Sequence, residues 1–126
     1  MNAMRKQVSR LLLAIGLLAF AATAGAVPAP FTITLESTSP YYEPARASVS
    51  AGSAVVWVNP TASYHTIQHD GCEDGPVCAF NSGSVPPNGR YTIEHLAPGE
   101  YPYHCELHPI MRGVLIVTPA AVSTES

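Results

Sequence analysis

The chain alternates short apolar segments with polar turns, and no long stretch repeats apolar residues at the spacing of a helix. Apolar and polar residues alternate over 31–36 and 90–95, which is typical of half-buried β-strands. Twelve prolines interrupt the remainder, so long helices are not expected. Turn signals between the segments favour an antiparallel β-sandwich or barrel. The other strand-like segments are 45–50, 54–58, 64–68, 79–81, 100–105 and 113–118.

The first 26 residues have a different pattern, which predicts an export signal. Three basic residues precede the apolar run 11–20, and the small residues 24–26 offer a cleavage site. The run is shorter than the about 20 residues needed to span a bilayer, although an uncleaved anchor is the alternative. We therefore expect a signal peptide over 1–26 and one domain over 27–126. The domain would lie in a periplasm or outside the cell, with no membrane span after cleavage.

Signal cleavage would leave an acidic domain. It would retain three arginines and no lysine against nine carboxylates, a formal net charge of −6. Nucleic-acid binding is not expected, because it needs cationic side chains that displace counterions from phosphates. The negative charge would instead steer the domain towards partner proteins with basic docking surfaces. Its length suits a monomer with a single small core.

Three cysteines in an exported chain leave one thiol unpaired after internal pairing. Cys72 and Cys78 are separated by five residues in the Gly-, Pro- and Asp-rich segment 70–88, and export to an oxidising compartment predicts a disulfide between them. A second metal site made by these two cysteines and His69 is the alternative. Cys105 would then be the free thiol.

Cys105 begins a Cys-x2-His-x2-Met pattern that continues with His108 and Met111. His65 lies forty residues upstream in a strand-like segment. Two imidazoles, a thiolate and a weak thioether are the donor set of a blue-copper electron-transfer centre. These residues are therefore predicted to bind one copper ion. The histidines not expected to be ligands are His69, His95 and His104, the last because strand neighbours point to opposite faces.

Outer hydrogen bonds usually orient metal ligands. We expect the backbone N–H of Thr66 to reach the sulfur of Cys105. The side chain of Asn59 is expected to tie the two ligand loops together.

Two other types of site use some of the same residues. A zinc site of one cysteine and two histidines is possible on donor type, but it leaves Met111 unexplained. A nucleophilic Cys105 with His65 or His108 as its base would need an open substrate cleft. The Tyr, Pro and Met residues around Cys105 predict a closed site instead, so the protein is not expected to be an enzyme.

The segments 51–59, 65–67, 80–83 and 98–117 together resemble the cupredoxins. The ligand loop is most similar to that of the amicyanin and plastocyanin group. The resemblance implies an all-β, eight-stranded Greek-key sandwich with type 1 copper, acting as a soluble one-electron carrier between redox proteins. It also implies four copper ligands, which match His65, Cys105, His108 and Met111.

The insertion closed by Cys72 and Cys78 departs from the plain amicyanin pattern. A copper-delivery protein of the same fold is the alternative function, and an interaction module with an empty site is a third. Electrons are expected to leave through the edge of His108, with a second route through His104. The apolar residues expected around His108 are Pro86, Pro87, Pro109 and Ile110.

Overall fold

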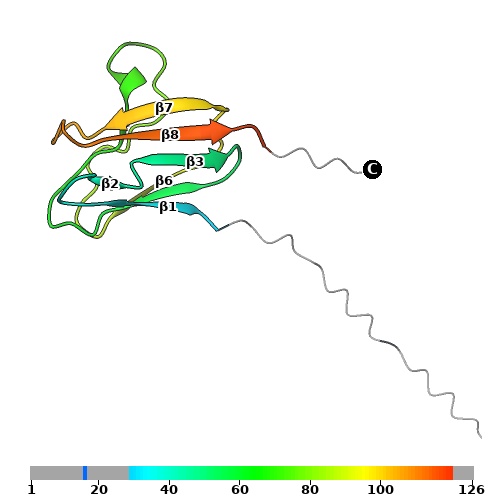
Figure 1. Cartoon of the computed structure of the whole chain (residues 1–126), viewed down its shortest axis with the longest axis horizontal. Helices are drawn as coiled ribbons and strands as arrows, with labels where there is room; N and C mark the ends of the chain where they lie inside the picture. Colours follow the sequence, from blue (N-terminus) through cyan, green and yellow to red (C-terminus); the bar gives the residue numbers. More distant parts are fainter. Residues whose placement is uncertain (1–15, 17–28, 121–126) are drawn as a thin grey trace, which may run out of the picture.

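The computed structural model describes Gly16 and residues 29–120, which fold into two β-sheets packed face to face (Figure 1). The predicted signal peptide, apart from Gly16, lies outside the described residues and stays a prediction. Among the residues described, no helix has the length and apolar character needed to cross a membrane.

Four strands form each sheet. The first has the order β2-β1-β4-β6 and contains Tyr42–Glu43, Phe31–Leu35, Val55–Val58 and Arg90–Ile93 in that order. The second has the order β3-β8-β7-β5 and contains Arg46–Ser50, Arg112–Thr118, Gly99–His104 and Gln68–His69. One pair in each sheet is parallel, β1 with β4 and β3 with β8, and the other pairs are antiparallel. The predicted eight-stranded all-β sandwich is confirmed, but the expectation of purely antiparallel sheets was wrong, because each sheet contains one parallel pair.

Two of the predicted strands differ from the observed ones, and one observed strand was not predicted. Of segment 64–68 only Gln68 enters a strand, β5, while His65 makes an isolated bridge with Val85. Segment 79–81 contributes a single bridge rather than a strand. The unpredicted strand β2 is only two residues long and has a proline close to each end, which weakens its strand signal. Just before His65, side-chain hydrogen bonds of Asn59 and Thr61 take the place of strand pairing.

The core lies between the sheets and is rich in aromatic residues. Trp57 has no exposed surface and meets Tyr103 edge-on, with ring centroids 5.6 Å apart. Burial of a large apolar side chain of this kind contributes about 1.5–3 kcal/mol to stability. The same buried cluster includes Cys105 and Met111. Two of the predicted ligands are therefore part of the core itself.

Gly113 lets β7 and β8 approach closely just after the ligand loop. It pairs with Tyr103, and a Cβ at this position would overlap the tyrosine ring. Burial raises the pKa of Tyr103 to about 12. The loop between β7 and β8 therefore starts and ends at a tightly packed strand pair.

Candidate metal centre

His65, Cys105 and His108 converge at one end of the sandwich. One donor atom from each residue lies within 4.8 Å of the other two. The Sγ of Cys105 is 4.0 Å from Nδ1 of His65 and 3.8 Å from Nδ1 of His108. Cys105 directly follows β7, His108 lies in the loop that leads to β8, and His65 comes from the connection between β4 and β5. The fold thus unites residues forty positions apart in the sequence.

The distances between these donor atoms suit a single small ion. Metal bonds of about 2.0 Å to imidazole nitrogen and about 2.3 Å to thiolate sulfur would separate N and S by about 3.5–3.8 Å. The observed 4.0 and 3.8 Å lie at or slightly above this range. Two histidines and one cysteine, with a weak thioether, are the donor set of blue copper.

Met111 completes the ligand loop. Its side chain is buried and lines a pocket of about 150 Å³ together with His65 and His108. Its backbone N–H donates to the carbonyl of His108 at 2.8 Å, and its carbonyl accepts from the N–H of Cys105 at 3.1 Å. These bonds close the loop on itself. Met111 therefore lines the same pocket as the two histidines, and its role as a weak fourth donor stays a prediction.

Thr61 fixes the orientation of the His65 ring, a role that the sequence analysis missed. Its hydroxyl lies 2.9 Å from Nε2 of His65 and donates its single hydrogen to Oδ1 of Asn59 at 2.6 Å. The hydroxyl must then accept a hydrogen bond from the Nε2–H group of His65. This assignment leaves the lone pair of Nδ1 free on the side of Cys105. The Asn-Pro-Thr turn, in which Asn59 also accepts from the N–H of Thr61, is the sequence signal that suggests such a bond.

Burial, and secondarily the neighbouring His108, lowers the pKa of His65. A proton therefore competes less with a metal for Nδ1 than it would at an ordinary histidine. The ring is held neutral to a more acidic pH, which suits a ligand that must be unprotonated.

Replacing Thr61 with valine should lower the affinity for copper by about 10–100-fold, because the Nε2–H group of His65 loses its acceptor. The measurement is competition for copper against a chelator of known affinity. Thr118→Val is the matched control, since it removes a hydroxyl that donates to the carbonyl of Val49 on β3. Equal affinities for the two variants would contradict the role of Thr61.

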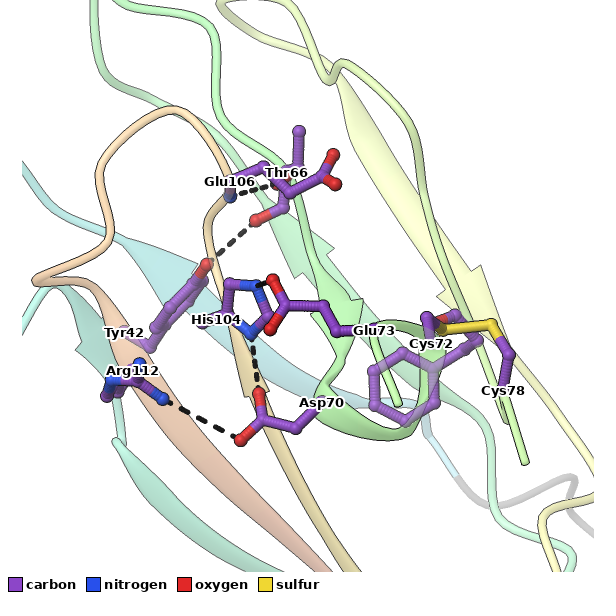
Figure 2. Close-up of polar contacts among 10 residues, drawn as sticks. Tyr42, Thr66, Asp70, Cys72, Glu73, Cys78, His104, Glu106 and Arg112 are labelled. Atoms are coloured by element: carbon purple, nitrogen blue, oxygen red, sulfur yellow. Dashed lines mark hydrogen bonds and ion pairs between the residues drawn. A yellow bond between two sulfur atoms is a disulfide. The ribbon is translucent and has the colours of Figure 1, made fainter. Parts of the chain in front are cut away.

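Thr66 joins the two ligand segments. Its N–H donates to the Sγ of Cys105 at 3.3 Å. Its hydroxyl accepts from the N–H of Glu106 at 2.8 Å (Figure 2). Its carbonyl accepts from the hydroxyl of Tyr42, which comes from β2. The thiolate thus has one backbone donor, and the connection around Thr66 follows Cys105 closely.

Asn59 has a different role from the expected one. Its amide Nδ2 donates to the carbonyls of Ser63 at 2.8 Å and of Val85 and Pro86 at 3.1 Å each. It therefore ties the His65 segment to residues 85–86. Within the described part of the chain it makes no hydrogen bond to residues 105–111, and Thr66 makes the link between the ligand loops instead.

The structure argues against two of the alternative sites. Cys105 has no exposed surface, so its thiol is not placed to attack a substrate. Cys72 and Cys78 form the predicted disulfide, so they are not thiolate ligands of a second metal. The Nδ1 of His69 accepts a hydrogen bond from the N–H of Ala79 at 3.1 Å. His95 is exposed, and His104 lies on the other side of β7 from Cys105, against Asp70 and Glu73.

Exposed apolar residues occur next to the ligands. His108 is exposed, and the neighbouring Ile110 is 71% exposed. Pro86 and Pro109 are exposed and Pro87 is partly buried. Tyr64 and Leu107, which are 56% and 52% exposed, were not among the predicted apolar residues. Each of these two residues adjoins a predicted ligand in the sequence, which is the signal that could have identified them.

Comparison with known proteins gives a consistent result. The family described as "Cupredoxin-like domain" matches residues 11–117. Amicyanin from Paracoccus denitrificans is 30% identical over 94 residues, which cover 75% of this chain and 71% of that protein. Amicyanin-alpha from Methylorubrum extorquens is 35% identical over 69 residues, 55% of this chain, and the match spans only 57% of the length of that relative. A purple cupredoxin from Nitrosopumilus maritimus has a similar fold, with a TM-score of 0.61, 24% identity and coverage of 70% of this chain and 99% of that chain.

Proposed function

This chain belongs to the cupredoxin family, and from that premise we propose that it is an exported, monomeric carrier that moves single electrons between redox proteins. Electron transfer through copper, rather than enzymatic catalysis, is the assigned function. The observation that carries the proposal is the convergence of two imidazole nitrogens and one fully buried thiol sulfur within 4.8 Å. The residues that would hold the ion are His65, Cys105, His108 and Met111.

Copper bound at this site would supply the change between the cupric and cuprous states. Imidazole serves both states, whereas thiolate and thioether favour the cuprous one. Fast electron transfer also needs ligands that do not move when the charge changes. The hydrogen bond that His65 donates to the hydroxyl of Thr61 and the one that the N–H of Thr66 donates to Cys105 restrict the two ligand segments. The closed loop from Cys105 to Met111 adds a third restriction.

His108 is the proposed exit for electrons. Its ring is close to the sulfur of Cys105 and is exposed, so a partner that touches it would be one side chain away from the metal. The second predicted route, through His104, is less accessible, because the side chain of His104 is only 6% exposed. A partner would meet the exposed apolar residues Tyr64, Leu107 and Ile110 around this end of the sandwich.

Replacing Ile110 with lysine should slow electron exchange with a basic c-type cytochrome by about tenfold, equivalent to about 1.4 kcal/mol. The positive charge would lie on an apolar contact surface and repel the basic partner, while the visible copper spectrum should remain unchanged. Stopped-flow mixing measures the rate. Val77→Lys is the matched control, because Val77 is 73% exposed but lies in the disulfide loop. Equal slowing by both variants would place the contact surface elsewhere.

Copper delivery by the same fold is distinguished by the rate of metal release. A carrier of electrons retains its ion in the presence of a mild chelator, and a delivery protein gives it up. The complete burial of Cys105 and the hydrogen bonds to both ligand segments favour retention. Release within the time of mixing would favour delivery.

A further inference from the structure

His104, the residue before the cysteine ligand, is held by two carboxylates. Its Nδ1 lies 2.5 Å from Oδ1 of Asp70, and its Nε2 lies 2.9 Å from Oε1 of Glu73 (Figure 2). Both ring nitrogens therefore lie within hydrogen-bond distance of acidic side chains, while the ring itself is buried. The second oxygen of Asp70 lies 3.7 Å from the guanidinium of Arg112, which pairs with His104 across β7 and β8.

Glu73 lies inside the loop 72–78 that the disulfide closes, and Asp70 lies two residues before that loop. β5 pairs with the end of β7 and aligns Gln68 with His104, so the loop begins directly beside the ring. The short 3-10 helix Asp70–Cys72 follows, and the N–H of Glu73 donates to the carbonyl of Asp70 at 3.1 Å. The Cys72–Cys78 bond is adjacent to Glu73 in the chain and holds its backbone in this position.

The loop is also anchored at its base. The ring of His69 packs between Phe80 and Tyr101, with centroid distances of 5.5 Å to each. Any Cβ at Gly71 would overlap the carbonyl of Val77 and the His69 ring, so the two sides of the loop are in close contact. The disulfide, the packing of the His69 ring and the close approach at Gly71 together hold the backbone that carries Asp70 and Glu73.

We propose that the disulfide loop is a clamp that positions the cysteine ligand, with Asp70 and Glu73 as the positioning residues. Neighbouring residues of a strand point to opposite faces. The clamp grips His104 on one face, while the N–H of Thr66 holds the sulfur of Cys105 on the other. The proposal rests on the proposed function in one respect, namely that Cys105 binds copper.

Asp70 and Glu73 contact the buried ring of His104, so their contacts should affect the structure more than an ion pair on the surface would. Exposed pairs contribute little on their own. Here the His104 side chain is only 6% exposed, so removing the acceptors leaves two ring nitrogens without partners away from water. The end of β7 would shift to satisfy them, and Cys105 would move with it.

The test compares copper release to a chelator, and the intensity of the thiolate-to-copper band, in the wild type and in the Asp70→Ala/Glu73→Ala variant. We expect release to become about tenfold faster and the band to weaken, as when other outer partners of ligands are removed. The single variant Glu73→Gln keeps Asp70 and an acceptor oxygen at position 73. Its copper release and band intensity should therefore be close to those of the wild type. Asp74→Ala, in the same loop, is the control and should change neither quantity.

The disulfide is tested by combination. If it acts through Glu73, then adding Cys72→Ser/Cys78→Ser to Glu73→Ala should accelerate release by less than the product of the separate effects. A full product would show that the disulfide acts elsewhere and would overturn this part of the clamp. Release and band identical to the wild type in Asp70→Ala/Glu73→Ala would overturn the whole proposal.

Amide hydrogen exchange of the metal-free proteins separates this inference from the copper assignment. The N–H of Cys105 donates to the carbonyl of Met111, and its exchange should be faster in Asp70→Ala/Glu73→Ala and in the single variant Glu73→Ala than in the wild type. Unchanged exchange would contradict the clamp. A wild-type protein that gives no copper band would contradict the proposed function, whereas the exchange result would still decide the clamp.

Discussion

Replacing Cys105 with serine is expected to remove the intense visible absorption of the copper-loaded protein completely. The absorption arises from charge transfer between thiolate and cupric ion, and Cys105 is the one free cysteine among the described residues. Its sulfur lies 4.0 Å from Nδ1 of His65 and 3.8 Å from Nδ1 of His108. A serine hydroxyl is a harder and weaker donor for copper, so the variant should also bind the metal less tightly.

Met111→Leu is the matched control for this experiment. It alters another buried residue of the same loop, the fourth predicted ligand, but a thioether is a weak donor that would mainly tune the reduction potential. The control should therefore stay blue, with a raised potential. Near-ultraviolet circular dichroism of the metal-free proteins checks that both variants are folded. A Cys105→Ser variant that remains blue would refute the ligand assignment.

Asn59→Ala is expected to lower the free energy of unfolding of the metal-free protein by about 3–5 kcal/mol, since several buried partners lose their hydrogen bonds at about 1 kcal/mol or more each. Its side chain is 1% exposed, donates to three carbonyls and accepts from two groups of Thr61. Because it holds the turn before His65, copper affinity should fall as well. Urea denaturation followed by circular dichroism gives the change in stability.

The control for Asn59→Ala is Asn81→Ala. The side chain of Asn81 is exposed and accepts one hydrogen bond, from the N–H of Gly83. Its loss should change stability by less than about 1 kcal/mol, as is usual for a surface position. If the two asparagines had similar effects, the turn that carries His65 would depend on other contacts.

The donor set and the fold class were predictable from the sequence for clear physical reasons. Cys105, His108 and Met111 lie within seven residues, so a short loop brings them together whatever the remainder of the fold does. Long alternating segments such as those that form β1, β6 and β8 carry their own strand signal. The disulfide followed from the count of cysteines and the expected compartment.

The local structure around His65 was less predictable. The expected strand 64–68 fails because Asn59 and Thr61 provide side-chain hydrogen bonds that compete with a ladder. The spacing of apolar residues in the sequence does not indicate where such side-chain hydrogen bonds form. The role of Thr61 appears only when its hydroxyl is seen 2.9 Å from the ring of His65.

The contacts of His104 could not be predicted from the pattern either. Strand alternation placed its ring away from Cys105, which is where the structure has it. The carboxylate of Asp70, however, is 34 residues earlier in the chain and reaches the ring only because β5 pairs with the end of β7. The two-residue length of β5 gives almost no sequence signal for that pairing.

The visible absorption spectrum of the domain, recorded after addition of cupric ion, tests the central claim most directly. The site predicts a strong thiolate-to-copper band that bleaches with ascorbate and returns with an oxidant, through several cycles without loss of metal. A pale solution that takes up copper would contradict type 1 coordination by Cys105. A blue protein that loses its copper on reduction would contradict electron transfer as the function.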